Sequence, residues 1–394
     1  MKWASALSEQ TPLSNAIEEC VSSVNQQLDG AAADLAVVFA SFHYQEQFED
    51  IPGLIRDQLD SPLVLGCSGG GIIGNGLEVE QQPALSITVA SLPNVTLKAF
   101  HLQADNLPDL DAGPQTWEDL VQVVKSDEPQ FILLADPYSF PAQNLILGLD
   151  FAFDQSAKIG GLASGAQQQG QNALFLEDQV YRSGAVGVAM SGNVVVDTVV
   201  AQGCRPIGKP MRITQSQRNL LGGLDGRPPV EVLRELFEGL NERDRGLMRT
   251  SLFLGVVMDG FIDEPRQGDF LIRNVMGMDD RAGVLSIGEV LKEGQLVQFH
   301  LRDAETSAED LIAVLDRYAG ENRENQAQGA LLFSCLGRGQ YLYGKSNHDT
   351  EVFQNKLGSV PMGGFFCNGE IGPVSGTTFL HGYTSSFGIF RPKY

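Results

Sequence analysis

The chain has 394 residues, of which 43% are hydrophobic and 19% are charged, a composition typical of a globular protein with room for two or three domains. Its formal net charge of −22 at pH 7 repels a phosphate backbone, and no Lys/Arg cluster offsets it, so nucleic acid is not an expected partner. No stretch approaches the roughly 18 apolar residues of a membrane span, and the first residues lack the apolar core of a secretory signal.

The cysteines and histidines are few and dispersed. There are five of each, and no two cysteines have the C-x-x-C spacing of a zinc site. An odd number of scattered cysteines fits a reducing compartment better than a disulfide framework. We therefore expect a cytoplasmic, acidic protein without a metal site and without a cofactor.

The first half of the chain alternates helix-like and strand-like segments. An amphipathic helix is predicted from Ser14, as its cap, to Gly30. Residues 84–90 and 95–102 are predicted as strands joined through residues 93–94, and Ser191-Gly192-Asn193 predicts a hairpin between strands 185–190 and 194–201. The other predicted elements are strands at 35–42, 62–65 and 131–135 and helices at 48–59, 117–124 and 142–154. This order predicts an α/β fold (mixed α+β) whose mixed sheets are partly parallel and have crossover helices.

A polar, glycine-rich stretch at residues 215–227 is the best candidate for a domain boundary. It predicts an N-terminal region of residues 1–220 and a C-terminal region of residues 221–394. The second region repeats the mixed pattern, with predicted helices at 229–240 and 308–318 and strands at 252–257, 270–274, 296–301 and 330–335.

A Gly-x4-Gly spacing occurs three times after an apolar run, and an apolar strand follows each one after a gap. The three pairs are Gly66 and Gly71, Gly160 and Gly165, and Gly364 and Gly369. The recurrence predicts internal duplication of a strand–glycine-loop–strand unit. The glycines can serve tight turns between packed strands, or they can let backbone N–H groups approach a ligand closely.

Several segments resemble the FIST family, whose members combine a FIST N-terminal and a FIST C-terminal region. The resemblance is carried by residues 330–339, by 347–349 and 361–373, by 269–274 and 298–303, and more weakly by 66–68 with Gly71. It implies an intracellular sensory module for small molecules such as amino acids. Some relatives are fused to signalling domains or to an F-box; we expect this chain, which shows neither, to signal through a protein partner.

Arg338 follows a predicted strand and lies between two glycines, where its guanidinium could hold a carboxylate through two hydrogen bonds. Asn368 and Glu370 could accept hydrogen bonds from an ammonium group. Alternatively, Arg338 is a solvated arginine in a turn, and Asn368 forms an Asn-Gly turn beside an exposed Glu370. For Arg302 the alternative is an ion pair with Asp303. The predicted ligand-binding residues are Gly66, Cys67, Ser68, Gly71, Arg338, Asn368, Gly369 and Glu370, with Arg273, Arg302, Cys335, His348 and Cys367 as secondary candidates.

The leading functional hypothesis is a sensor of an amino acid or a similar small carboxylate. A second hypothesis is a protein-interaction or assembly factor without a small ligand. A third is a hydrolase-like enzyme with Cys335 or Cys367 as nucleophile, His348 as base and Asp349 or Glu370 orienting the base.

Overall fold

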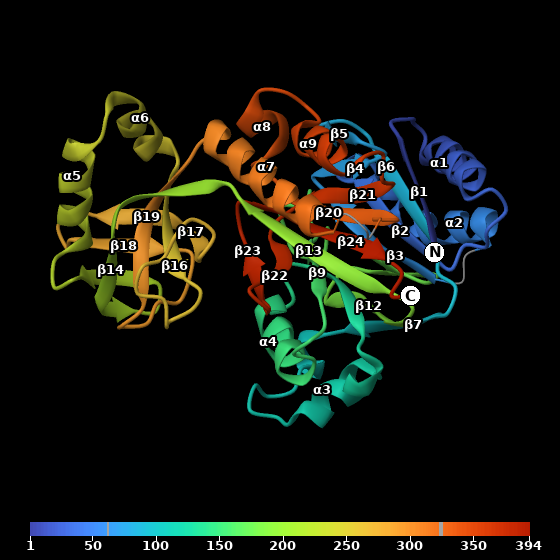
Figure 1. The fold of residues 1–394 in the computed structure, drawn as a ribbon, viewed down its shortest axis with the longest axis horizontal. Helices are drawn as coiled ribbons and strands as arrows, with labels where there is room; N and C mark the ends of the chain where they lie inside the picture. Colours follow the sequence, from blue (N-terminus) through green and yellow to red (C-terminus); the bar gives the residue numbers. More distant parts are fainter. Residues whose placement is uncertain (61–62, 323–325) are drawn as a thin grey trace. The chain divides into compact units, whose positions relative to one another are not determined.

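The computed structural model describes residues 1–60, 63–322 and 326–394, which form two units (Figure 1). The first unit is made of Met1–Val200, Ile312–Leu380 and Thr384–Tyr394, and the second of Ala201–Leu311 and His381–Tyr383. The mixed fold class is confirmed, because parallel strand pairs and antiparallel strands share the same sheets. Residues 215–227, predicted as a boundary, lie within the second unit, and the division into 1–220 and 221–394 stays a prediction.

Three copies of one motif build the first unit. In each copy a strand and a helix precede two parallel strands with a helical crossover, and a hairpin and a last strand follow. The first copy consists of β1 (Lys2–Ser8), α1 (Leu13–Leu28), β2 (Leu35–Ser41), η1 (Phe42–Asp50), α2 (Ile51–Leu59), β3 (Leu63–Gly69), β4 (Gly71–Gly74), β5 (Leu77–Glu80) and β6 (Leu85–Ser91). The second consists of β7 (Val95–Leu102), η2 (Ala104–Asn106), α3 (Pro114–Val121), η3 (Lys125–Asp127), β8 (Gln130–Ala135), α4 (Ala142–Ala152), β9 (Lys158–Leu162), β10 (Leu174–Leu176), β11 (Gln179–Tyr181) and β12 (Ala185–Gly192). The third consists of β13 (Val195–Gln202), α7 (Ala304–Glu321), β20 (Gly329–Cys335), α8 (Gly339–Tyr343), α9 (His348–Leu357), β21 (Met362–Cys367), β22 (Glu370–Val374), β23 (Thr377–His381) and β24 (Thr384–Arg391).

Each copy gives four strands to one six-stranded sheet and its hairpin to the sheet of another copy. Within the described residues, the sheet orders are β1-β6-β2-β3-β10-β11, β7-β12-β8-β9-β22-β23 and β13-β24-β20-β21-β4-β5. The hairpin β4–β5 of the first copy therefore completes the third sheet, β10–β11 completes the first sheet, and β22–β23 completes the second. The predicted internal duplication is confirmed, and the described chain contains the motif three times.

The first glycine of each Gly-x4-Gly lies in the second strand of a parallel pair and has a packing reason to be glycine. A Cβ at that position would lie about 2 Å from the carbonyl oxygen of the residue opposite, far inside van der Waals contact. The three pairs and their Cβ–O distances are Gly66 and Val38 at 2.0 Å, Gly160 and Leu133 at 1.8 Å, and Gly364 and Leu332 at 2.0 Å. The sequence repeat thus marks equivalent strand positions.

Directly after these strands, the three glycine loops bind one another. At equivalent positions, a backbone N–H of one loop donates to a backbone carbonyl of another loop. At one of the three positions the bond is indirect, because a serine hydroxyl lies between the N–H and the carbonyl. The three bonds are Ser164 N–H to Ser68 O at 3.2 Å, Asn368 N–H to Leu162 O at 3.1 Å, and Gly70 N–H to Ser164 Oγ at 2.8 Å, with Ser164 Oγ donating in turn to Phe366 O. These hydrogen bonds connect the three loops to one another in a ring.

Aromatic side chains from two of the sheets fill the core next to these loops. Phe39 of β2 stacks on Phe365 of β21 at 4.8 Å between ring centroids, and Phe333 of β20 meets Phe39 edge-on at 6.3 Å. Helix α1 buries one apolar face, including Ile17 and Val24, against β1 and β6. In the described part of the chain, no helix combines the length and apolar character that crossing a membrane requires.

The second unit is inserted in the chain between β13 and α7, and its strands close into a barrel of order β14-β15-β18-β17-β16-β19. Leu254, Leu285 and Phe299 are fully buried in the apolar cluster of this barrel. Its elements are β14 (Cys204–Gln217), β15 (Leu220–Leu224), α5 (Pro229–Gly239), α6 (Glu242–Thr250), β16 (Leu252–Val257), β17 (Phe270–Asp279), β18 (Val284–Ile287) and β19 (Leu296–Arg302).

Two local predictions differ from the structure, and a third lies partly outside the described residues. Helix α1 starts at Leu13 after Pro12, and Ser14 is inside the helix rather than its cap. Strands β12 and β13 do not form a hairpin around residues 191–193, because β12 pairs with β7 and β8 and β13 pairs with β24. The strand predicted at 62–65 is β3, and its residue 62 lies outside the described residues.

Candidate functional site

A buried ion pair connects the end of β20 to α9. The side chain of Arg338 is fully buried, and its Nε and Nη2 donate to the two carboxylate oxygens of Asp349 at 2.8 and 3.1 Å. Nη2 also donates to the hydroxyl of Tyr343, whose ring stacks on His348 at 3.5 Å. Asp349 accepts a further hydrogen bond from the hydroxyl of Ser385. Burial opposes ionisation of Asp349, but the adjacent Arg338 guanidinium holds the pKa of this carboxyl well below its usual range.

Two polar atoms of this network are unsatisfied. Across residues 1–60, 63–322 and 326–394, neither Nη1 of Arg338 nor Oε2 of Glu78 has a hydrogen-bond partner, although both atoms are buried. The other oxygen of Glu78 accepts from the backbone N–H of Thr350 at 2.8 Å. Burial, and then the negative charge of Asp349, raise the pKa of Glu78 to about 8. Glu78 is therefore a neutral acid at pH 7 beside an ionised one.

The residues predicted in the glycine loops are held by contacts between strands. A Cβ on Gly71 would lie 2.7 Å from the ring of Phe366, and one on Gly369 would lie 3.1 Å from Leu162 and Leu380 side chains. Ser68 is fully buried, and its hydroxyl donates to the amide oxygen of Asn172 at 3.3 Å. Packing thus accounts for these glycines without a ligand, and ligand contact by this set, which also contains Gly66, stays a prediction.

The acceptor side chains of the third loop are differently placed. Asn368 is exposed, and its amide donates to the carbonyl of Ala163 at 3.1 Å. Glu370 is fully buried and accepts from the backbone N–H and the hydroxyl of Thr384 at 3.1 and 2.8 Å. The carboxylate of Glu370 is therefore already occupied by hydrogen bonds from the first residue of β24.

Cys335 and Cys367, the two candidate nucleophiles, are register partners across the parallel strands β20 and β21. Cys67 and Cys367 are fully buried, and burial raises the pKa of both thiols well above the ordinary value; Glu370, Cys335 and Cys67 raise that of Cys367 further. The thiol of Cys367 donates to Ser334 O at 3.3 Å, whereas His348 contacts Asp349 at 3.0 Å. A raised pKa disfavours the thiolate that nucleophilic chemistry at Cys367 requires.

Arg302, at the end of β19 in the second unit, carries a different arrangement. Its side chain is 7% exposed, and within the described residues its Nε and Nη2 are buried without a hydrogen-bond partner. These two nitrogens form the edge of the guanidinium that binds a carboxylate through two parallel bonds. The neighbouring Asp303 pairs instead with Arg205 at 2.9 Å and with Arg243 at 3.6 Å.

The ring of Tyr383 lies over this guanidinium, with 5.0 Å between the ring centroid and Cζ of Arg302. Three contacts fix the tyrosine: its carbonyl accepts from Gly203, its hydroxyl donates to Asn274, and its ring packs on Phe253 at 4.3 Å. Its φ of +67° is unusual for a bulky side chain, and such strain occurs mostly at functional positions. The structure therefore holds an aromatic ring over a buried cation.

Gln202 contributes another unsatisfied atom to the second unit. Its amide nitrogen donates to the carbonyls of Gly268 and Phe270, while its buried Oε1 has no partner in the described part of the chain. Gln202 lies two residues before Cys204, and Cys204 is the register partner of Arg302 across β14 and β19. The third predicted arginine, Arg273, instead forms an ion pair with Glu289 at 2.9 Å and also donates to the backbone carbonyl of Ile272.

Comparison with known families assigns both parts of the chain. The FIST N domain matches residues 34–227, and the FIST C domain matches residues 229–373. The chain belongs to the FIST family. The FIST C match includes the barrel helices α5 and α6 and continues through β20 and β21 of the third copy.

Relatives of this FIST protein include bacterial and plant sequences. An uncharacterized protein of Mycobacterium tuberculosis is 35% identical over 390 residues, which are 99% of this chain and 100% of the relative. An F-box/LRR-repeat protein of Arabidopsis thaliana is 23% identical over 64% of this chain and 53% of its own length. Among solved structures, a cyanuric acid hydrolase from A. caulinodans covers 99% of both chains at 7% identity with a TM-score of 0.34, too weak a likeness to support an argument.

The FIST motifs contain the arginines of both networks and also Asp349, the partner of Arg338. The sequence predicts Asp349 only as an orienting group for a histidine, and it predicts no role for Glu78, Gln202 or Tyr383. Their positions depend on contacts between residues far apart in sequence, such as the 272 positions between Glu78 and Thr350. A left-handed tyrosine after Gly382 has no sequence signature that would have shown it.

We expect the stability of the first FIST unit to fall with rising pH because of Glu78. Between the ordinary value of 4.5 and about 8, the folded protein keeps a proton on Glu78 that the unfolded chain has lost, so raising the pH favours unfolding. Glu78→Gln should make the stability less dependent on pH, because glutamine does not ionise. The amide oxygen can still accept the hydrogen bond from the backbone N–H of Thr350. Urea titrations at pH 5 and pH 8.5 can follow the unit through its buried tryptophans, Trp3 and Trp117.

Glu18→Gln, on the exposed face of α1, is the control and should leave the pH dependence as it is in the native chain. Equal pH dependence in the native and Glu78→Gln proteins would show that Glu78 ionises normally in the folded state.

Proposed function

We propose that this FIST protein senses a small carboxylate, an amino acid being the preferred class, and passes its ligand state to a protein partner. FIST domains are sensory modules, which supports this role. The ligand class rests on the chemistry of the arginines in the predicted set.

The observation that carries the proposal is the unpaired edge of Arg302. A buried guanidinium keeps its charge at any accessible pH, so it needs an anion or hydrogen-bond acceptors to offset the loss of water. In the described residues, Nε and Nη2 have none. A carboxylate would satisfy both nitrogens through charge-assisted bonds worth about 1.5–3 kcal/mol each. The Oε1 of Gln202 is an unused acceptor suited to an ammonium group.

Arg338 is a weaker candidate for the same role. Its charge is already matched by Asp349, which uses Nε and Nη2, so only Nη1 is left for a further acceptor. A ligand carboxylate would have to compete with Asp349 for the Nε and Nη2 edge of the Arg338 guanidinium. We therefore propose Arg302 as the main carboxylate contact and keep Arg338 as a secondary one.

The covered position of Arg302 fits a sensor. Because its Nε and Nη2 are inaccessible to water, a ligand reaches them only when the surrounding groups move. Tyr383, whose ring lies over the guanidinium in a strained backbone conformation, is the group we expect to shift. A ligand that favours the shifted arrangement changes the population of the two states, which a partner can then read.

Arg302→Met is expected to abolish ligand binding without unfolding the protein. Isothermal titration calorimetry of the full chain with each of the common amino acids should reveal at least one ligand. The amide of that amino acid, which lacks the carboxylate, should bind at least tenfold more weakly, about 1.4 kcal/mol. Arg302→Lys keeps the positive charge but cannot bind a carboxylate through two parallel hydrogen bonds, so it should lose most of the affinity for the amino acid.

The same Arg302→Met variant should be as stable as the native chain or more so, since it replaces an unpaired buried charge with an apolar side chain. Hydrogen exchange of β16 and β19 measures this in the second unit. The matched control is Arg266→Met, an exposed arginine of the same unit, which should change neither binding nor exchange. Binding that survives in Arg302→Met, or no binding by any amino acid together with stable capture of a protein partner, would favour the assembly-factor hypothesis.

A further inference from the structure

The barrel contains a cavity with a clear structural origin. Strand β14 bulges away from β19, because three residues of β14 between Ile207 and Met211 face only Gln298. Gly208 in the bulge has a φ of +66°, and the following residues include Pro210, which has no N–H for the ladder. The side-chain amide of Gln298 donates to the carbonyls of Ile207 and Gly208, at 3.4 and 3.1 Å, and so holds the bulge open.

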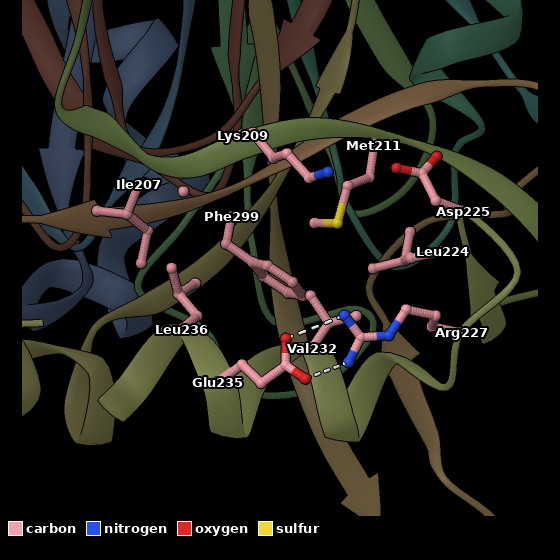
Figure 2. Close-up of a pocket in the computed structure, with 11 residues that line it drawn as sticks. Ile207, Lys209, Met211, Leu224, Asp225, Arg227, Val232, Glu235, Leu236 and Phe299 are labelled. Atoms are coloured by element: carbon pink, nitrogen blue, oxygen red, sulfur yellow. Dashed lines mark hydrogen bonds and ion pairs between the residues drawn. The ribbon is translucent and has the colours of Figure 1, made fainter. Parts of the chain in front are cut away.

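The opened strand and helix α5 border a partly open cavity of about 250 Å³ (Figure 2). Apolar side chains make up most of the walls, with the ring of Phe299 in the middle of the view. The apolar lining residues are Ile207, Met211, Leu224, Val232, Leu236 and Phe299. An apolar cavity of about 150 Å³ is enough to hold benzene, so this one has room for a larger hydrocarbon group.

Charged side chains stand around this apolar interior. Arg227 and Glu235 neutralise each other through two hydrogen bonds, drawn in Figure 2. Asp225 accepts from the backbone N–H of Arg212 at 2.9 Å. Lys209, within residues 201–311, is the lining cation without a carboxylate partner, and Figure 2 shows its side chain extending along the cavity above Phe299.

We infer that the barrel cavity is a second binding site, for a small amphiphile with a hydrocarbon body and a carboxylate head. The hydrocarbon body occupies the apolar interior beside Phe299 and Leu236, and the carboxylate pairs with the ammonium of Lys209. This site uses none of the residues proposed for the amino-acid ligand. It gives the protein a way to respond to an acyl-type metabolite independently of Arg302.

Calorimetric titration of the full chain with octanoate tests the inference. Octanoate should bind, 1-octanol should bind about tenfold more weakly because it lacks the charge, and acetate should not bind because it lacks the hydrocarbon body. Val232→Trp, which fills the cavity from α5, should abolish octanoate binding, and Lys209→Gln should weaken octanoate to the level of octanol. Leu236→Trp is a second filling variant in case Val232→Trp does not fold, which circular dichroism would reveal.

Arg302→Met separates this site from the proposed amino-acid site and should leave octanoate binding unchanged. The inference is overturned if octanoate does not bind, if it binds folded Val232→Trp and Leu236→Trp as well as the native chain, or if native and Lys209→Gln proteins bind it equally. Octanoate binding that is lost in Arg302→Met and kept in the filled variants would also overturn it, since the acid would then occupy the arginine site.

Discussion

Asp349→Asn is expected to destabilise the first unit by about 3–5 kcal/mol, the usual cost of removing one partner of a buried ion pair. The substitution keeps the shape of the side chain and leaves the fully buried guanidinium of Arg338 without a counter-ion. Urea unfolding followed by the fluorescence of Trp3 and Trp117 reports on this unit alone, because both tryptophans of the chain belong to it.

The exposed pair of Lys345, between α8 and α9, and Glu351 of α9 provides the control. Both of its side chains are more than half exposed, so Glu351→Gln should cost less than about 1 kcal/mol. The double variant Arg338→Met/Asp349→Leu should recover much of the loss, since it removes both buried charges together. A loss below about 1 kcal/mol in Asp349→Asn would mean that the guanidinium finds other acceptors.

Gly160→Ala should be at least as damaging, costing about 4 kcal/mol or more, or preventing folding. The new Cβ would lie 1.8 Å from the carbonyl oxygen of Leu133, and the backbone φ of +154° is one that alanine rarely adopts. The strands β8 and β9 would have to separate, and with them the sheet that β22 and β23 complete. The same urea titration, with the yield of folded protein, measures the effect.

Gly53→Ala is the matched control within the same unit. Gly53 lies in helix α2, and a Cβ there has no atom within 4 Å, so alanine should stabilise by about 0.5–1 kcal/mol. If Gly160→Ala unfolds within about 1 kcal/mol of the native protein, strand spacing does not explain the glycine, and close approach of a ligand becomes the better explanation.

The sequence repeat of glycines led directly to the main feature of the fold. The first glycine of each Gly-x4-Gly avoids the same collision between a side chain and the opposite carbonyl, as at Gly66 and Val38, so the constraint is local enough to leave a sequence trace. The helices and most strands were predictable for a similar reason, since their apolar periodicity reflects which face is buried.

Strand pairing was not predictable in the same way. The hairpin predicted around Gly192 has good turn residues, yet β13 pairs with β24, nearly 190 residues further along the chain. Strand β4 pairs with β5 in its own hairpin, but nothing in its local sequence indicates that its other edge pairs with β21 of the third copy. Partner choice depends on the complementarity of whole sheets, which a single strand does not encode.

The candidate site was predicted only in part. The motifs pointed to Arg338 and Arg302, but burial and pairing decide what each can do, and these depend on Asp349 in one case and on the absence of a described acceptor in the other. The sequence analysis does not predict the cavity beside Phe299, although Gly208 and Pro210 within a strand-like stretch are a recognisable sign of a bulge.

The exchange of hairpins among the three copies has a consequence for synthesis on the ribosome. The first sheet is complete once β11 has emerged, but the second sheet waits for β22 and β23 and the third for β20, β21 and β24, which all come much later in the chain. Sheet edges on the nascent chain therefore stay open until these strands emerge, and chaperone protection of those edges becomes part of how this protein reaches its native state.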